Sequence, residues 1–166
     1  SIYKLYPDKR AIYLAALQQY MNEGVSRGEQ RETVLSPENA LRETLEFVAQ
    51  LTASPDGEKG CFTISAASEL LPGDGEVKEK VVFKFNKIID QLEKILVAGQ
   101  TQKIFRQDES ARVMATSIFM MIEGMRVYGK IQPNIEDLRS SNDFIVRSVL
   151  ENASDDNRNL SKQAST

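Results

Sequence analysis

The side chains best suited to chemistry in this sequence lie at two places, near its N-terminal end and at its single cysteine. Residues 1–10 read SIYKLYPDKR and combine Tyr3 with the cations Lys4, Lys9 and Arg10. A tyrosine hydroxyl and lysine ammonium groups are side chains that commonly contact phosphate oxygens. The competing interpretation is an ordinary solvated helix start, and the residues alone leave both open.

The thiol of Cys61 is the second candidate. It follows Gly60 at a predicted helix start, where free backbone amides and the helix dipole favour a reactive thiol. A small buried apolar side chain is the alternative role for this residue. A single cysteine cannot form a disulfide within the chain, which is typical of a cytosolic protein.

The residue inventory excludes several reaction classes. The chain has no histidine, so Ser-His-Asp and Cys-His catalysis, histidine zinc sites and Glu-x-x-His di-iron sites are absent. It also lacks G-x-G-x-x-G, Walker A and G-x-S-x-G motifs. Carboxylate-only or lysine-based catalysis stays open, but no motif points to it. We therefore expect no enzyme activity, no cofactor and no metal.

Composition and charge predict one compact domain with a single basic edge. The 166 residues are 41% hydrophobic and 27% charged, with a net charge of −3. Residues 1–10 carry +2, so the remainder carries −5, and a polyanion would meet the N-terminal edge. The longest apolar run, 118–122, is too short to cross a bilayer, and no signal peptide is visible. We expect a cytoplasmic protein that does not bind membranes.

Hydrophobic periodicity predicts helices almost throughout and no strand that we would defend. The N-cap signals are Asp8, Ser36 and Asp108, while Gly24 and Gly28 are expected to end the first helix. The expected helices span about residues 8–23, 37–53, 61–71, 76–103, 108–131 and 134–150. The predicted organisation is an end of a first domain at 1–7, a helical domain at 8–152 and a polar tail at 153–166.

The helix expected at 108–131 has material for two buried faces. Its charges after the first turn, Arg112, Glu123, Arg126 and Lys130, fall on one narrow stripe, and nearly all other positions are apolar or small. One face can pack on the long helix at 76–103, and the other needs a further partner. We expect a homodimer formed by the last two helices of each copy. The expected interface centre is Phe119, Met120, Gly124, Val127, Phe144 and Val149.

The opening stretch SIYKLYPDKRAIYLAAL resembles the end of the DNA-binding domain of TetR-family transcriptional regulators. In that family the recognition helix closes on two spaced aromatic residues, after which a polar residue and a lysine begin the next helix, as in YxxFxsKxxL. Here Tyr3, Tyr6 and Lys9 match in register, with Tyr6 in place of the commoner Phe. GCFTISAASEL and GMRVYGK resemble a short helix and the end of the penultimate helix in the same family.

This resemblance implies an all-α fold of the TetR regulatory type, with a remnant of an N-terminal helix-turn-helix whose first helices are expected ahead of Ser1. It implies operator DNA as a partner, with Tyr3, Lys4 and Lys9 at phosphate-contacting positions and Tyr6 in the core. Because some family members sense electrophiles through cysteines, it adds that role to the possibilities for Cys61. Residues upstream of Ser1 would decide the matter.

The resemblance also implies a small-molecule pocket among the middle helices and the penultimate one. The alternative for each candidate is plain core. The candidates are Phe47, Leu51, Phe62, Ser65, Phe85, Ile89, Met114 and Met121. Glu69 and Arg126 are polar candidates for orienting a ligand, with a surface position as their alternative.

Two functions follow as hypotheses. The first is a ligand-responsive DNA-binding repressor that a small molecule releases from its operator. The second is an all-helical dimeric interaction module without a DNA role. A helix-turn-helix directly ahead of Ser1 distinguishes them.

Overall fold

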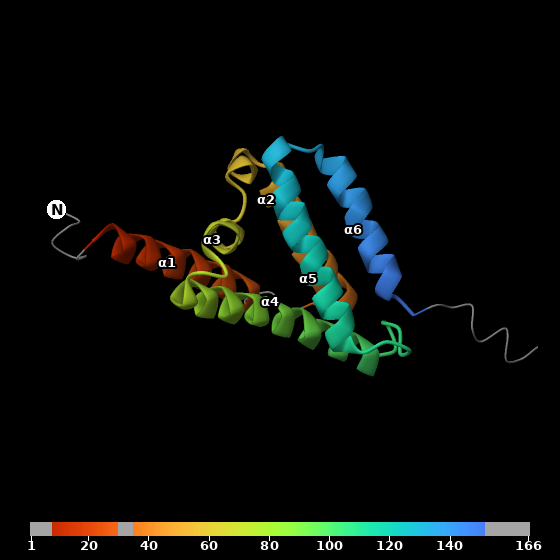
Figure 1. Cartoon of the computed structure of the whole chain (residues 1–166). Helices are drawn as coiled ribbons and strands as arrows, with labels where there is room; N and C mark the ends of the chain where they lie inside the picture. The colour runs from red at the N-terminus through yellow and green to blue at the C-terminus, as the bar shows by residue number, and fades with distance from the viewer. Residues whose placement is uncertain (1–7, 30–34, 152–166) are drawn as a thin grey trace, which may run out of the picture.

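The computed structural model describes residues 8–29 and 35–151, with the backbone alone for 24–29 (Figure 1). Apart from an isolated bridge between Phe105 and Leu150, all regular structure in these ranges is helical. The elements are α1 Lys9–Glu29, α2 Pro37–Ala53, the 3-10 helix η2 Pro55–Lys59, α3 Phe62–Leu70, α4 Gly75–Thr101, α5 Ala111–Tyr128, the 3-10 helix η3 Gly129–Ile131 and α6 Ile135–Val149. The all-α prediction is confirmed.

Side-chain hydrogen bonds cap the N-termini of α1 and α2. The Asp8 carboxylate accepts a hydrogen bond from the Ala11 N–H at 2.8 Å, so Asp8 caps α1 as predicted. The Ser36 hydroxyl accepts from the Asn39 N–H at 3.4 Å and caps α2, with Pro37 in the first turn.

Two predicted helix ends are wrong. Asp108 does not cap the penultimate helix, because its carboxylate pairs with Arg106 at 2.6 Å; Ser110 caps α5 instead. The first helix does not end at Gly24 but continues to Glu29. A helical glycine costs only about 1 kcal/mol relative to alanine, which the rest of a long helix can outweigh.

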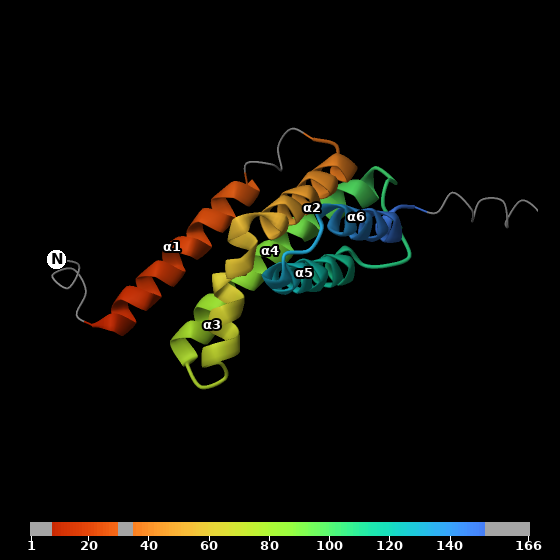
Figure 2. The same cartoon turned by 90° about the horizontal axis from the view of Figure 1, so that it is seen from above.

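The helices form two packed groups that share α4. Helices α2, α5 and α6 lie side by side across the C-terminal half of α4, and α1 lies along its N-terminal half with α3 beside it (Figures 1 and 2). The larger apolar cluster is centred on α2, α4, α5 and α6 and includes the fully buried Leu41, Leu45, Leu96, Phe105 and Ala115. The smaller consists of Leu17, Met21, Ala66, Val77 and Val81, from α1, α3 and α4.

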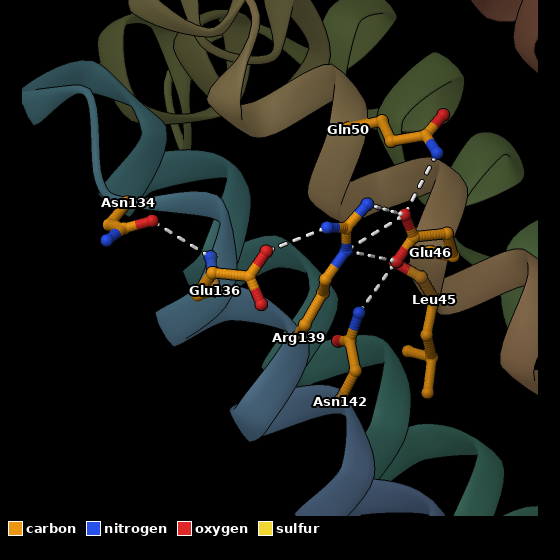
Figure 3. Close-up of polar contacts among 7 residues, drawn as sticks. All are labelled: Leu45, Glu46, Gln50, Asn134, Glu136, Arg139 and Asn142. Carbon is orange, nitrogen blue, oxygen red and sulfur yellow. Dashed lines mark hydrogen bonds and ion pairs between the residues drawn. The ribbon is translucent and has the colours of Figure 1, made fainter.

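Helix α6 is attached to α2 by a polar network (Figure 3). Arg139 donates to both carboxylate oxygens of Glu46, at 2.6 to 3.2 Å, and to Glu136 at 2.8 Å. The buried Asn142 amide donates to the Leu45 carbonyl at 2.9 Å. These contacts fix α6 against α2, while the outward side of α5 and α6 remains uncovered in the protomer.

Candidate functional site

A cavity of about 480 Å³ lies where α1, α2, η2, α3 and α5 meet. Its apolar walls come from Leu51 at the end of α2 and Phe62 at the start of α3. The lining residues are Tyr20, Glu23, Leu51, Asp56, Lys59, Gly60, Phe62, Ser65 and Arg126. Charged and polar side chains thus outnumber the apolar ones, and small-molecule sites combine such polar groups with an apolar surface.

Arg126 of α5 is the buried cation of this cavity, with only 6% of its surface exposed. It donates to the Gly60 carbonyl at 3.0 Å and, more weakly, to the Thr52 hydroxyl at 3.4 Å. A left-handed φ of 69° at Gly60 turns the chain from η2 into α3. Within the described residues, no carboxylate forms an ion pair with Arg126.

Two further ionisable groups lie near Arg126, the buried Lys84 and the half-buried Glu123. The Lys84 ammonium of α4 is 6% exposed and donates to the Met21 carbonyl of α1 at 3.0 Å. Burial raises the pKa of Glu123 to about 7, although the charges of Arg126 and Lys84 act in the opposite direction. One Glu123 carboxyl oxygen, Oε2, has no hydrogen-bond partner. Burial therefore outweighs the attraction of both cations for this carboxylate.

Helix α1 forms one wall of the cavity through aromatic contacts. The Phe62 ring meets the edges of Tyr13 and Tyr20, with ring centroids 5.2 and 5.9 Å apart. Burial raises the pKa of Tyr20, as does the Cys61 thiol beside it, whereas the Arg126 charge lowers it. The position of α1 is thereby linked to the residues that line the cavity.

A second candidate surface is the outward face of α5 and α6. Here a groove of about 720 Å³ runs between the two helices and includes Met121, Gly124, Tyr128 and Phe144. Large apolar side chains stand exposed on this face: Val113, Met120, Met121, Val127, Tyr128 and Phe144. Exposed apolar patches of this kind mark interaction surfaces.

The comparison with protein families agrees with this architecture. The model of the tetracyclin repressor-like C-terminal domain matches residues 37–140. The chain belongs to this family. The match covers α2 to α5 and the start of α6, and so includes all the cavity-lining residues except Tyr20 and Glu23 of α1. No curated protein gives a significant match to the sequence.

Solved structures share the TetR-type fold. A TetR-family transcriptional regulator from Agrobacterium tumefaciens has a TM-score of 0.79 and 19% identity, over 90% of this chain and 78% of the other. The regulatory protein TetR from Rhodobacter sphaeroides has a TM-score of 0.79 and 16% identity, over 90% of this chain and 80% of the other. The transcriptional regulator FadR from Bacillus subtilis, in complex with stearoyl-CoA, has a TM-score of 0.66 and 17% identity, over 88% of this chain and 77% of the other.

The cavity brings together three of the eight predicted pocket residues, Leu51, Phe62 and Ser65. The other five lie elsewhere. Ile89 and Met114 are buried in the larger cluster, Phe47 packs against it, and Met121 lines the outer groove. Phe85 stacks on Phe119 with ring centroids 5.0 Å apart, outside the cavity.

Arg126, for which the sequence left a surface position as the alternative, is buried in the cavity wall, whereas Glu69 is exposed. Sequence reasoning missed Tyr20 and Gly60, and gave no role to Lys84. A signal for Arg126 did exist, because the charged stripe of α5 borders the buried face of that helix. Arg112, on the same stripe, pairs with α4 at Asp90 and Glu93 at 2.6 and 2.9 Å.

The remaining predicted residues divide between the protomer core, the exposed face and the chain ends. Of the six interface candidates, Phe119 and Val149 are buried within the protomer and the other four are exposed, and the interface stays a prediction. Lys9 is exposed at the start of α1, and Tyr3, Lys4 and Tyr6 lie outside the described residues. Cys61 is half-buried next to Tyr20, and its sensor role stays a prediction.

Two searches of the described residues gave no site. None of the described helices is long and apolar enough to cross a membrane. No group of three or more potential metal ligands occurs within residues 8–29 and 35–151.

Proposed function

We propose that this protein is a homodimeric transcriptional repressor of the cytoplasm that releases operator DNA when a small molecule occupies the cavity. The observation that carries the proposal is that α1, the helix nearest the expected DNA-binding end, forms a wall of the cavity. The presence of stearoyl-CoA in the FadR relative supports a ligand role for a fold of this type.

The proposed mechanism moves α1 as a rigid rod. Contacts to α4 hold this helix: Arg10 pairs with Asp74 at 2.5 Å, and the Lys84 ammonium binds the Met21 carbonyl at 3.0 Å. A ligand that displaces Tyr20 changes the angle of α1 and carries Lys9 with it. In a dimer this alters the separation of two recognition helices, which must match half-sites about 34–36 Å apart.

The DNA-binding role rests on the sequence resemblance. We propose that residues 1–7 end a helix-turn-helix domain, that 8–152 form the regulatory domain and that 153–166 are a tail. Tyr3, Lys4 and Lys9 would then contact phosphates. The exposed position of Lys9 is compatible with this role.

Reciprocal linkage tests the mechanism. Compounds that raise the melting temperature of this chain are titrated into the protein extended by the residues ahead of Ser1, with and without operator DNA selected from a random library. DNA must weaken effector affinity by the same factor by which the effector weakens DNA affinity, typically about 5–150-fold. Equal effector affinity in both titrations, despite tight DNA binding, rules out the mechanism.

The dimer face has its own test. Phe144 is 64% exposed on the proposed interface, and Phe83, 56% exposed on α4, lies outside it. We expect light scattering at micromolar concentration to show a dimer for the wild type and for Phe83→Glu, but a monomer for Phe144→Glu. A monomeric wild type would contradict the proposal.

The alternative is a dimeric helical interaction module without a DNA role, which the same exposed face would serve. It predicts that the extended protein binds no DNA sequence in preference to others, while Phe144→Glu still abolishes the dimer.

A further inference from the structure

We propose that the cavity binds an organic monoanion, a carboxylic acid with a compact apolar body, and that Arg126 receives its carboxylate. The inference deepens the proposed function, because it takes the same cavity as the effector site and adds the chemical class of the effector.

The first argument is the state of the Arg126 guanidinium. Only 6% of the side chain is exposed, and its hydrogen-bond partners, the Gly60 carbonyl and the Thr52 hydroxyl, are neutral. A guanidinium has five N–H donors, and these two bonds leave others available. A buried charge is costly without a paired charge, and an anionic ligand would supply one.

The second argument is the charge balance around the cavity. Of the two buried cations Lys84 and Arg126, Arg126 lines the cavity and Lys84 does not. Burial raises the pKa of the nearby Glu123, which also lies outside the lining, to about 7, so this carboxyl is only partly ionised at neutral pH and offsets the Arg126 charge only in part. The rim adds little, since the exposed Asp56 and Lys59 pair with each other at 2.7 Å. The exposed Glu23 is the other rim charge.

The third argument is the start of α3, which opens on the cavity at Phe62. Cys61 occupies the N-cap position but makes no side-chain cap bond to the amides of the first turn. Helix N-termini favour anions through their free N–H groups and the helix dipole. Together with the buried Arg126, this places two sources of positive potential on the same cavity.

The apolar walls and the volume define the rest of the ligand. Leu51 and Phe62 offer a hydrophobic surface, while Ser65 and Tyr20 offer hydroxyl groups. A volume of about 480 Å³ lies within the range of small-molecule sites. A guanidinium fork matches one carboxylate, and the single charge of Arg126 balances a monoanion but not a phosphate dianion.

The test compares acids with their neutral isosteres by isothermal titration calorimetry on this chain. The probes are hexanoate, octanoate and decanoate, each paired with its primary amide. We expect at least one acid to bind at least ten-fold more tightly than its amide, because hydrogen bonds between two charged groups are stronger than neutral ones. Equal affinity within a pair, or no binding by any of the three acids, overturns the inference.

Two variants assign the preference to Arg126. In Arg126→Gln the acid should lose its advantage while the amide binds as in the wild type, and Arg126→Lys should keep part of the advantage. Circular dichroism and the melting temperature establish whether each variant is folded. If Arg126→Gln does not fold, the acid and amide comparison on the wild type still decides the ligand class. An undiminished preference in folded Arg126→Gln overturns the role of Arg126.

The ligand inference and the repressor mechanism can fail independently of each other. Acids that bind this chain through Arg126 but leave DNA affinity of the extended protein unchanged would support the inference and contradict the repressor mechanism. Effectors that release DNA but are neutral or cationic would do the reverse.

Discussion

The two apolar clusters of this protein differ in what surrounds them. The larger holds 19 buried residues from four helices and the α4–α5 connection, and it is apolar except where Asn142 reaches the Leu45 carbonyl. The smaller holds five, and it adjoins the cavity, the buried Lys84 and Arg126, and the half-buried Glu123. Well-packed apolar groups resist displacement, whereas a region with a cavity and buried charges loses fewer packing contacts when it rearranges. We therefore expect the larger cluster to contribute more of the folding stability and the smaller cluster to change its conformation more easily.

Phe105→Ala should give the largest effect, since it opens the larger cluster. Phe105 is fully buried, and its ring lies directly over Gly99 of α4. We expect the free energy of unfolding to fall by about 3–5 kcal/mol, from lost burial and the cavity that remains. Urea denaturation followed by circular dichroism measures it. A loss below about 1 kcal/mol would show that this cluster is not tightly packed.

Glu123→Gln should remove a pH dependence of stability at the other cluster. In the wild type, the folded state holds the Glu123 proton up to about pH 7, whereas the unfolded state releases it near the ordinary glutamate value of 4.5. The free energy of unfolding therefore falls as pH rises between these values, by at most roughly 3 kcal/mol. We expect Glu123→Gln to lack this fall and to be the more stable protein at about pH 8.

Denaturation of both proteins at about pH 4 and about pH 8 checks this prediction. The difference between variant and wild type should be small at the lower pH, where the carboxyl is protonated in both states. A difference that does not change with pH would contradict the buried, neutral state of Glu123.

Leu17→Ala should weaken the smaller cluster locally. Leu17 is fully buried between α1 and its neighbours, and its truncation should cost about 2 kcal/mol. Because α1 contacts only α3 and α4 extensively, we expect its amides to lose protection from hydrogen exchange while those of α5 keep theirs. Equal loss of protection in both helices would show that the two clusters unfold as one unit.

Arg139→Ala should have the smallest effect, although Arg139 makes several hydrogen bonds in the network of Figure 3. The Arg139 and Glu46 side chains are 42% and 35% exposed, so solvent screens their attraction. We expect only a small loss in the free energy of unfolding, smaller still in about 1 M salt. A loss as large as that of Leu17→Ala would mean that α6 depends on this pair for its attachment.

The sequence by itself determined the local structure and the family. Caps such as Asp8 and Ser36 act within one helical turn, so their positions could be predicted from neighbouring residues alone. The two apolar faces of α5 follow from helical periodicity, and the structure has one buried and one exposed. Three of the predicted cavity residues were also found, because Leu51 lies at the end of a recognisable helix, and Phe62 and Ser65 at the start of one.

Only the tertiary structure decided which side chains share the cavity. Arg126 is buried because η2 and the end of α2 cover its side of α5, and Tyr20 lines the cavity because α1 packs across α3. Helical periodicity fixes the direction of a side chain around its own axis but not the neighbour that covers it. That choice depends on contacts between residues far apart in the chain, such as the Arg126 bond to Gly60 across 66 positions. For this reason the charged stripe was visible in the sequence, while its burial beside a cavity was not.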